Sequence, residues 1–173
     1  MTDPERAPDA HTILAALPKG SGLVWRAYDT VLTRHALRAL ERHASKKKIM
    51  LLIASMPSDA RKLRFHHRHF AGHRVKTTYT DQFTTAAAHS EKEIIAAARA
   101  GIDAVLISPV FATVSHKDAK PLGALRFADL ARIARTKNLV VYALGGVTDE
   151  NKIRRLKGSG LTGIAGIGLF VQA

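Results

Sequence analysis

Cysteine is absent from the 173-residue sequence, which excludes disulfides, thiolate nucleophiles and thiolate metal sites. Long apolar runs are also absent, since none approaches the roughly 18 residues that a membrane span needs. The first residues, 1–6, are polar and partly acidic, unlike a signal peptide. These absences predict a soluble, unexported protein of the cytoplasm with no membrane partner.

Acidic residues are scarce: 14 Asp and Glu stand against 27 Lys and Arg, which gives a net charge of +13. Such a field attracts phosphate esters, diphosphates and nucleic acids alike. The basic residues form several short clusters with few aromatic residues between them. We therefore interpret them as solvated helix and loop faces, and no nucleic-acid motif is visible.

Aromatic residues make up only 6% of the chain, whereas hydrophobic residues make up 46%, mostly Ala, Leu, Ile and Val. This composition predicts one domain over residues 1–173, with helices packed on a sheet. Apolar runs and helical periods alternate along the chain. The predicted strands are 22–26, 49–54, 65–67, 83–88, 103–108, 139–144 and 162–167, and the predicted helices are 31–44, 91–98, 124–136 and 148–156.

Short links between strands and helices predict a parallel sheet, whose strands all end at one edge. A hydroxyl-rich loop, Thr113-Val114-Ser115, follows one of these strands, and a double glycine, Gly145-Gly146, follows the next. Such loops expose backbone N–H groups that bind phosphate. We expect the functional site at this edge.

The same segments resemble the second half of the thiamine phosphate synthase and TenI family. The matching motifs, in family order, are Ala88-His89, Gly101-Ile102-Asp103, Ser108-Pro109-Val110-Phe111, Thr113-Val114-Ser115, Gly123, Ala143-Leu144-Gly145-Gly146-Val147-Thr148 and Gly163-Ile164-Ala165-Gly166-Ile167. The first half of the chain resembles the family more weakly, through residues 24–26 and 49–54.

The resemblance implies an α/β fold of the (β/α)₈ TIM-barrel type. The chain is shorter than the roughly 200 residues at the low end for such barrels. Residues 1–4 resemble the end of the family's first strand, and the sequence stops near the start of its last helix. We therefore expect a barrel incomplete at the first strand and the last helix, whose exposed edges favour a homodimer.

The family's synthases join a thiazole phosphate to a pyrimidine diphosphate and release diphosphate with the help of Mg²⁺. On the thiazole-phosphate side the family's loops are largely retained. The residues that the resemblance assigns to substrate binding are Ser108, Thr113, Val114, Ser115, Gly145, Gly146, Ile167 and Gly168. Ser108 is equally well explained as a small packing residue.

The pyrimidine-diphosphate side is depleted. Arg26 remains from the family's segment after the second strand, but the Asn-Asp pair that contributes a Mg²⁺ ligand is Ala54-Ser55. The family's lysine after the hydroxyl loop is His116. Because Mg²⁺ requires hard oxygen ligands, we expect no metal site and assign no other cofactor. Arg26 and His116 are the cations that remain to stabilise a diphosphate.

Histidines suggest a second chemistry. His89 and His116 could transfer a proton on a thiazole ring at neutral pH, as in TenI-like tautomerases. The catalytic histidine of those members is Pro109 here, however. His89 is explained equally well by the start of a helix. The histidines within 66–73 are expected on an exposed basic strand or loop, not at a metal site, because neighbouring strand residues point to opposite faces.

Two classes of function remain open. We favour an enzyme of thiamine biosynthesis that binds thiazole phosphate and couples it to pyrimidine diphosphate, with a TenI-like thiazole tautomerase as the alternative enzyme. The other class is a noncatalytic protein that binds a phosphate ester or nucleic acid. His116, His89 and Arg26 are the predicted catalytic residues.

Overall fold

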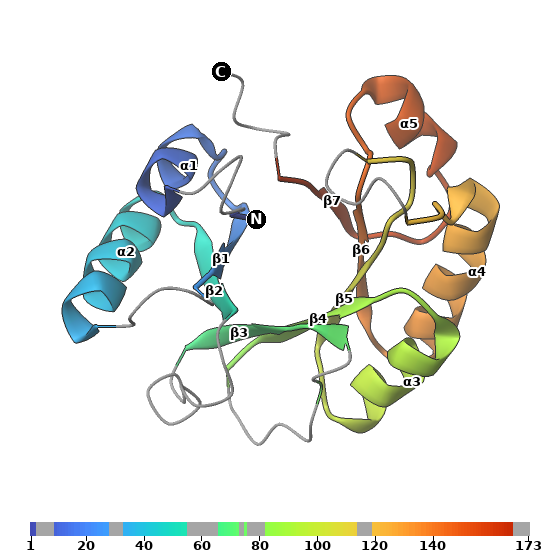
Figure 1. Ribbon diagram of the computed structural model, residues 1–173, viewed down its shortest axis with the longest axis horizontal. Coiled ribbons are helices and arrows are strands. Elements are labelled where there is room, and N and C mark those ends of the chain that lie inside the picture. Colours follow the sequence, from blue (N-terminus) through green and yellow to red (C-terminus); the bar gives the residue numbers. More distant parts are fainter. Residues whose placement is uncertain are drawn as a thin grey trace. The chain divides into compact units, whose positions relative to one another are not determined.

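The computed structural model of the chain describes residues 1–2, 9–27, 33–54, 66–72, 75, 82–113 and 119–167. Contacts within the chain define two compact units. The first comprises residues 1–69, 80–83 and 167–173, and the second comprises residues 70–79 and 84–166. Both are built from parallel strands and helices (Figure 1).

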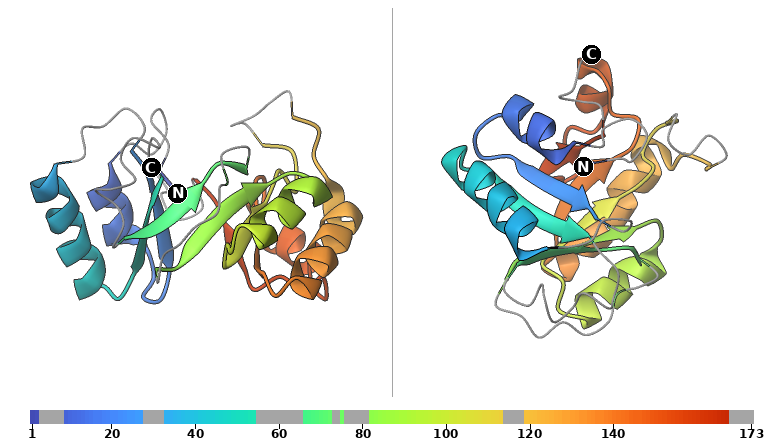
Figure 2. Two further views of the ribbon diagram at one scale, coloured as in Figure 1. Left: turned by 90° about the horizontal axis from the view of Figure 1, so that it is seen from below. Right: turned by 60° about the vertical axis from the view of Figure 1, so that its left-hand side comes forward.

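The first unit contains a parallel sheet in the order β1-β2-β3. Its elements are α1 (Ala10–Ala16), β1 (Gly22–Arg26), α2 (Arg34–Lys46), β2 (Met50–Ala54) and most of β3 (His67–Phe70). Figure 2 shows α1 and α2 beside β1 and β2. Buried apolar side chains from these helices and strands, such as Leu14, Leu23 and Leu40, form one core cluster.

The second unit contains a parallel sheet in the order β4-β5-β6-β7. Its elements are β4 (Thr84–Ala88), α3 (Glu91–Arg99), β5 (Ala104–Ile107), α4 (Gly123–Thr136), β6 (Val140–Leu144), α5 (Glu150–Arg155) and β7 (Gly163–Ala165). The three helices follow one another along the outer side of these strands (Figure 1). Phe127, Leu130 and Ile94 pack from the helices onto Val105 and Val141, and all five are buried.

The strand at the centre of this sheet is buried throughout. All four residues of β5 are buried, as expected for a parallel strand covered on both faces. Because β4, β5 and β6 run in parallel, their carboxyl ends lie at one edge, and their amino ends lie at the opposite edge. The loops after these three strands therefore lie on the same side of the second unit.

Local capping confirms the predicted start of α3 and identifies the start of α5. Ser90 Oγ accepts a hydrogen bond from the Glu93 N–H at 3.3 Å, as the capping-box prediction required. Asp149 caps α5 by accepting from the Lys152 N–H at 3.0 Å.

The predicted strands and helices are all present in the structure, with ends that differ by a few residues. The sequence reading did not foresee α1. Only a few residues of the sequence mark this helix. Asp9 caps it by accepting hydrogen bonds from the N–H groups of His11 and Thr12, and Ile13 and Leu14 are buried in the core. A helix of seven residues shows too little periodicity to be recognised before its core partners are known.

The residues that the structure describes contain seven strands, all paired in parallel fashion, so the α/β class is confirmed. Closure of a (β/α)₈ barrel stays a prediction, as does the single domain. Thr2 lies beside β1, because its N–H donates to the Val24 carbonyl at 2.9 Å. The expected incompleteness at the last helix concerns residues outside the described ranges and stays a prediction. Within those ranges, no helix has both the length and the apolar character for a membrane crossing.

Candidate functional site

His89 follows β4 directly, and its backbone and ring are both held in place. Its backbone N–H donates to Glu93 Oε2 at 2.6 Å. Glu93 lies in the first turn of α3, and Ser90 Oγ also donates to it, at 3.2 Å. On the ring, Nδ1 lies 2.7 Å from the backbone oxygen of Ser108, which follows β5. His89 therefore joins the carboxyl ends of two neighbouring strands.

The contact with the Ser108 carbonyl determines the protonation of the neutral His89 ring. A carbonyl oxygen can only accept a hydrogen bond, so Nδ1 must carry the proton. In the neutral ring the other nitrogen, Nε2, then holds the free lone pair. The Ser108 hydroxyl lies 3.4 Å from the same Nδ1. His89 is exposed and Ser108 is buried, so the ring stands at the surface of this edge with Nε2 as a proton acceptor.

The double glycine after β6 forms a turn that other residues could not adopt without strain. Gly145 and Gly146 have φ values of +91° and +69°. A Cβ atom on Gly146 would lie 2.6 Å from the Phe111 carbonyl oxygen and still closer to that of Ala112. A Cβ on Gly145 would lie 3.1 Å from Pro109. Both glycines are therefore required by their conformation and by the close approach of the loop after β5.

Backbone hydrogen bonds join the loop after β5 to its neighbours. The Val110 N–H donates to the Leu144 carbonyl at 3.0 Å, and the Phe111 N–H donates to the Gly145 carbonyl at 3.1 Å. On its other side this loop meets the start of α4, where Gly123 donates to the Val110 carbonyl at 2.9 Å. The described residues of the two loops are thus joined by backbone hydrogen bonds into one strip along the edge.

The amide groups of the double glycine are available to a ligand. Within the described part of the chain, the N–H groups of Gly145 and Gly146 have no hydrogen-bond acceptor, although their carbonyl neighbours are engaged. Consecutive free amides in left-handed turns form a concave donor surface for anions. This geometry suits one face of a phosphate group.

Arg155 adds a positive charge beside this strip. Its guanidinium carbon lies 5.0 Å from the centroid of the Phe111 ring, and that ring is buried. Arg155 is the last residue of α5, so α5 contacts the loop after β5 through this cation–π pair. The sequence reading did not foresee Arg155, because only the fold brings residues 111 and 155 together.

The structure brings five predicted residues to one edge of the second unit: His89, Ser108, Thr113, Gly145 and Gly146. Thr113 is half-buried at the end of the described part of its loop. The other predicted residues of the loops, Val114, Ser115, His116 and Gly168, lie outside the described residues. Their assigned roles stay predictions.

Arg26 and Ile167 belong to the first unit. Arg26 ends β1, is half-buried, and donates its backbone N–H to Thr2 Oγ1 at 2.7 Å. Ile167 is partly buried against the core of the first unit. The structure does not place either residue relative to the glycine loop, Gly145-Gly146. Their assigned roles in the site therefore stay predictions.

The histidines of β3 were expected on an exposed strand or loop, and this is wrong for His69, which is only 7% exposed. Burial, together with the positive charge of Arg26, lowers the pKa of His69 to about 4. The others have partners: His67 Nδ1 accepts from the Phe83 N–H at 3.0 Å, and His66 Nε2 lies 2.9 Å from Glu41 Oε1. His69 is at the one buried position of β3, and the other three residues of the strand are partly buried.

The Mg²⁺ site that the family resemblance implies does not fit the residues present. Ala54 is fully buried at the end of β2, and its carbonyl accepts from the Ala27 N–H at 2.7 Å. The sequence contains no Asp or Glu in residues 65–73. Across the described ranges, no three His, Asp or Glu side chains cluster as metal ligands would. Hard oxygen donors are lacking at these positions, so the residues there do not fit a Mg²⁺ ion.

Comparison with family models and with known proteins identifies relatives of this chain. The family model of thiamine monophosphate synthase matches residues 2–170. A relative from Aquifex aeolicus, "Putative thiamine-phosphate synthase 2", is 40% identical over 85 residues, which cover 49% of this chain and 44% of the relative. Thiamine-phosphate synthase from Leuconostoc citreum is 32% identical over 74 residues, which cover 43% of this chain and 34% of the relative. The matched segments thus span less than half the length of these curated relatives.

A solved structure, thiamine phosphate pyrophosphorylase from Pyrococcus furiosus, resembles this chain in fold. The TM-score is 0.73 at 19% sequence identity, and the match covers 96% of this chain and 83% of that one. At this level of identity the likeness concerns the fold alone.

Proposed function

We propose that this chain, which belongs to the thiamine monophosphate synthase family, acts in thiamine biosynthesis by binding a thiazole phosphate at the carboxyl ends of β5 and β6. One observation carries the proposal. The free amides of Gly145 and Gly146 stand beside a loop that begins with a buried serine and carries hydroxyl residues. Loops at this edge of α/β barrels commonly bind phosphate.

The chemistry of the bound phosphate follows from these groups. Amide donors and hydroxyls bind the oxygens of a phosphate monoester, while the positive field of the protein raises its local concentration. Ser115 would add a hydroxyl in the position that the family resemblance gives it. Coupling to a pyrimidine diphosphate belongs to the same proposal, with Arg26 and His116 as the cations that would stabilise the leaving diphosphate.

A calorimetric titration with thiazole phosphate tests the binding, at moderate salt so that the general positive field is screened. We expect saturable one-to-one binding, weakened about tenfold or more by Ser115→Ala, because a hydrogen bond to a charged group is worth about 1.5–3 kcal/mol. Absence of saturable binding by the wild-type chain would overturn the proposal. A second titration adds the pyrimidine diphosphate, with and without Mg²⁺, and measures thiamine phosphate.

Glycine variants provide a matched pair for the same titration. Gly146 and Gly158 both have positive φ, +69° and +81°, so alanine strains the backbone at either position. Only at Gly146 does the added Cβ collide with the neighbouring loop, since no atom lies within 4 Å of a Cβ at Gly158. We expect Gly146→Ala to lose thiazole-phosphate binding and Gly158→Ala to keep it. Equal affinities would contradict the assignment.

His89 supports a second function, proton transfer on the thiazole ring. The Ser108 carbonyl holds the ring so that Nε2 is the proton acceptor, at the edge where the phosphate is proposed to bind. A tautomerase needs a base of this kind near neutral pH. Exchange of a ring proton of thiazole phosphate for deuterium, followed by NMR, should slow at least a hundredfold in His89→Gln while binding is kept. An unchanged exchange rate would remove His89 from the chemistry.

A further inference from the structure

A depression of about 450 Å³ lies at the opposite end of β6 and β7, where no function has been assigned. Its walls come from the end of α4, the start of β6 and the turn before β7. Its volume is in the range of small-molecule sites in proteins. The strands run through the second unit, so this depression is at their amino ends, whereas the glycine loop is at the carboxyl end of β6.

One wall carries an arginine whose place depends on a glycine. Arg135, in the last turn of α4, packs against Gly160, and a Cβ added to Gly160 would lie 2.6 Å from Arg135 Nη1 and 3.0 Å from its Cδ. Gly160 has a φ of +81°. Because Gly160 has no Cβ, the Arg135 side chain can occupy this space at the depression.

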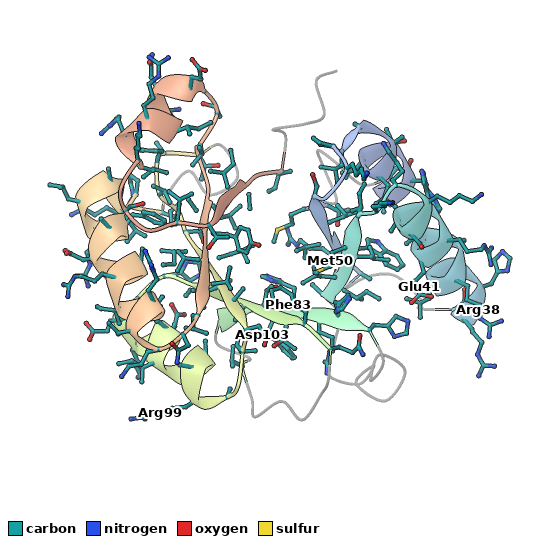
Figure 3. All side chains as sticks on the ribbon, turned by 180° about the vertical axis from the view of Figure 1, so that it is seen from behind. Arg38, Glu41, Met50, Phe83, Arg99 and Asp103 are labelled. Carbon is teal, nitrogen blue, oxygen red and sulfur yellow. The ribbon has the colours of Figure 1, made fainter. Side chains whose placement is uncertain are left out.

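The charge of Arg135 is not neutralised by the protein. Among the residues that the structure describes, its guanidinium forms no ion pair and no hydrogen bond, although its backbone carbonyl accepts from Asn138 at 2.9 Å. Asp103, whose carbonyl accepts from the Val140 N–H at the start of β6, has its carboxylate engaged by Thr84, whose N–H donates at 2.7 Å and whose hydroxyl donates at 2.9 Å. Figure 3 shows Asp103 at the amino end of β5.

Neutral donors line the same depression. The N–H groups of Gly160 and Leu161 find no acceptor in the described ranges. The exposed side chains of Asn138 and Thr162 add an amide and a hydroxyl. Asn138 is fixed in the left-handed conformation, with a φ of +60°. The partly buried Leu161 adds apolar surface beside these polar groups, and Leu139, which also lines the depression, is only 4% exposed.

We infer that this depression is a second anion site, which takes a phosphate monoester carried on a small apolar group. The Arg135 guanidinium supplies the charge, the Gly160 and Leu161 amides supply directional donors, and the leucines cover the apolar part of the ligand. The site is independent of the proposed thiazole-phosphate site, because it lies at the other ends of the strands.

Phenyl phosphate is the probe, added at constant ionic strength to the ¹⁵N-labelled chain and followed by two-dimensional NMR. The amides of Gly160 and Leu161 and the Nε–H of Arg135 should shift together and saturate. Inorganic phosphate should bind at least several-fold more weakly, because it leaves the leucines uncovered. Any response at Gly145 and Gly146 is read separately, so the two sites are distinguished in one experiment.

Arg135→Gln should weaken the binding of phenyl phosphate at least tenfold, as measured from the amide shifts of Gly160 and Leu161. Arg132→Gln is the matched control, since Arg132 lies on the same helix, is exposed, and does not line the depression. The affinity of the Arg132→Gln variant for phenyl phosphate should stay within twofold of that of the wild type. The inference is overturned if the Gly160 and Leu161 amides do not saturate, or if Arg135→Gln and Arg132→Gln weaken binding equally.

Discussion

At the candidate site, the position of a residue after a strand is visible in the sequence, whereas its contacts with residues of other strands are not. Gly145 and Gly146 could be identified from their position after an apolar strand, and the structure gives both of them positive φ values. The hydrogen bond from His89 to the Ser108 carbonyl could not be identified in this way, because it joins residues that are 19 positions apart and follow two different strands. Arg155 beside Phe111 was missed for the same reason.

His69 allows a prediction at the residue scale about pH. Burial, and then the charge of Arg26, lowers its pKa from 6.5 to about 4 in the folded chain. Between these values the unfolded chain binds a proton that the folded chain does not, so the free energy of unfolding decreases as the pH falls through this window. The contribution is of the order of 3 kcal/mol, at 1.36 kcal/mol for each pKa unit.

His69→Gln should therefore flatten the pH dependence of stability between about pH 6.5 and 4, measured by urea denaturation at several pH values. His35→Gln is the control, because His35 is an exposed histidine of α2 and should leave the slope unchanged. If the free energy of unfolding of His69→Gln keeps the wild-type dependence on pH, the loss of stability in acid does not come from His69.

At the scale of elements, the sequence predicted the strands and longer helices because their apolar periods extend over several residues. The β5 strand is buried at all four positions, and Leu130 of α4 is fully buried, as the helical period required, whereas Leu125, assigned to the same face, is 86% exposed. Short elements were less accessible. The helix α1, of seven residues, was missed, whereas β7 was predicted over 162–167 although only three residues form it and all three are half-buried.

Asp103 couples two strands, which gives a prediction at this scale. Its carboxylate accepts from the N–H and hydroxyl of Thr84, so the amino ends of β4 and β5 are joined beyond their ladder. Thr84 is 1% exposed, and Asp103→Ala would leave its N–H buried without this acceptor. We expect a loss of about 1–3 kcal/mol in the free energy of unfolding.

Asp129→Ala is the comparison for that experiment. Asp129 lies on α4, is exposed, and its carboxylate Oδ1 lies 3.9 Å from Arg132 Nη2. An exposed pair of this kind contributes at most about 1 kcal/mol. Denaturation midpoints that fall equally in the two variants would show that the Asp103 bridge adds no stability.

At the scale of the whole molecule, the sequence predicted the family and the α/β class, and the comparisons confirm both. The recognisable motifs concentrate in residues 88–167, most of which form the second unit. The first unit retains the apolar core of its strands but lacks the carboxylates of the family's metal site. Substitutions of that kind can be read from the sequence, whereas contacts such as that of Arg155 with Phe111 depend on the fold and are not encoded in a motif.

The measurement that tests the thiazole-phosphate site most directly is an NMR titration of the ¹⁵N-labelled chain with thiazole phosphate at moderate salt. If the proposal is right, the amides of Gly145 and Gly146 shift and saturate with the same affinity that calorimetry reports, since they donate to the phosphate. Calorimetric binding with both glycine amides unchanged would contradict it, because the ligand would then be bound elsewhere on the chain.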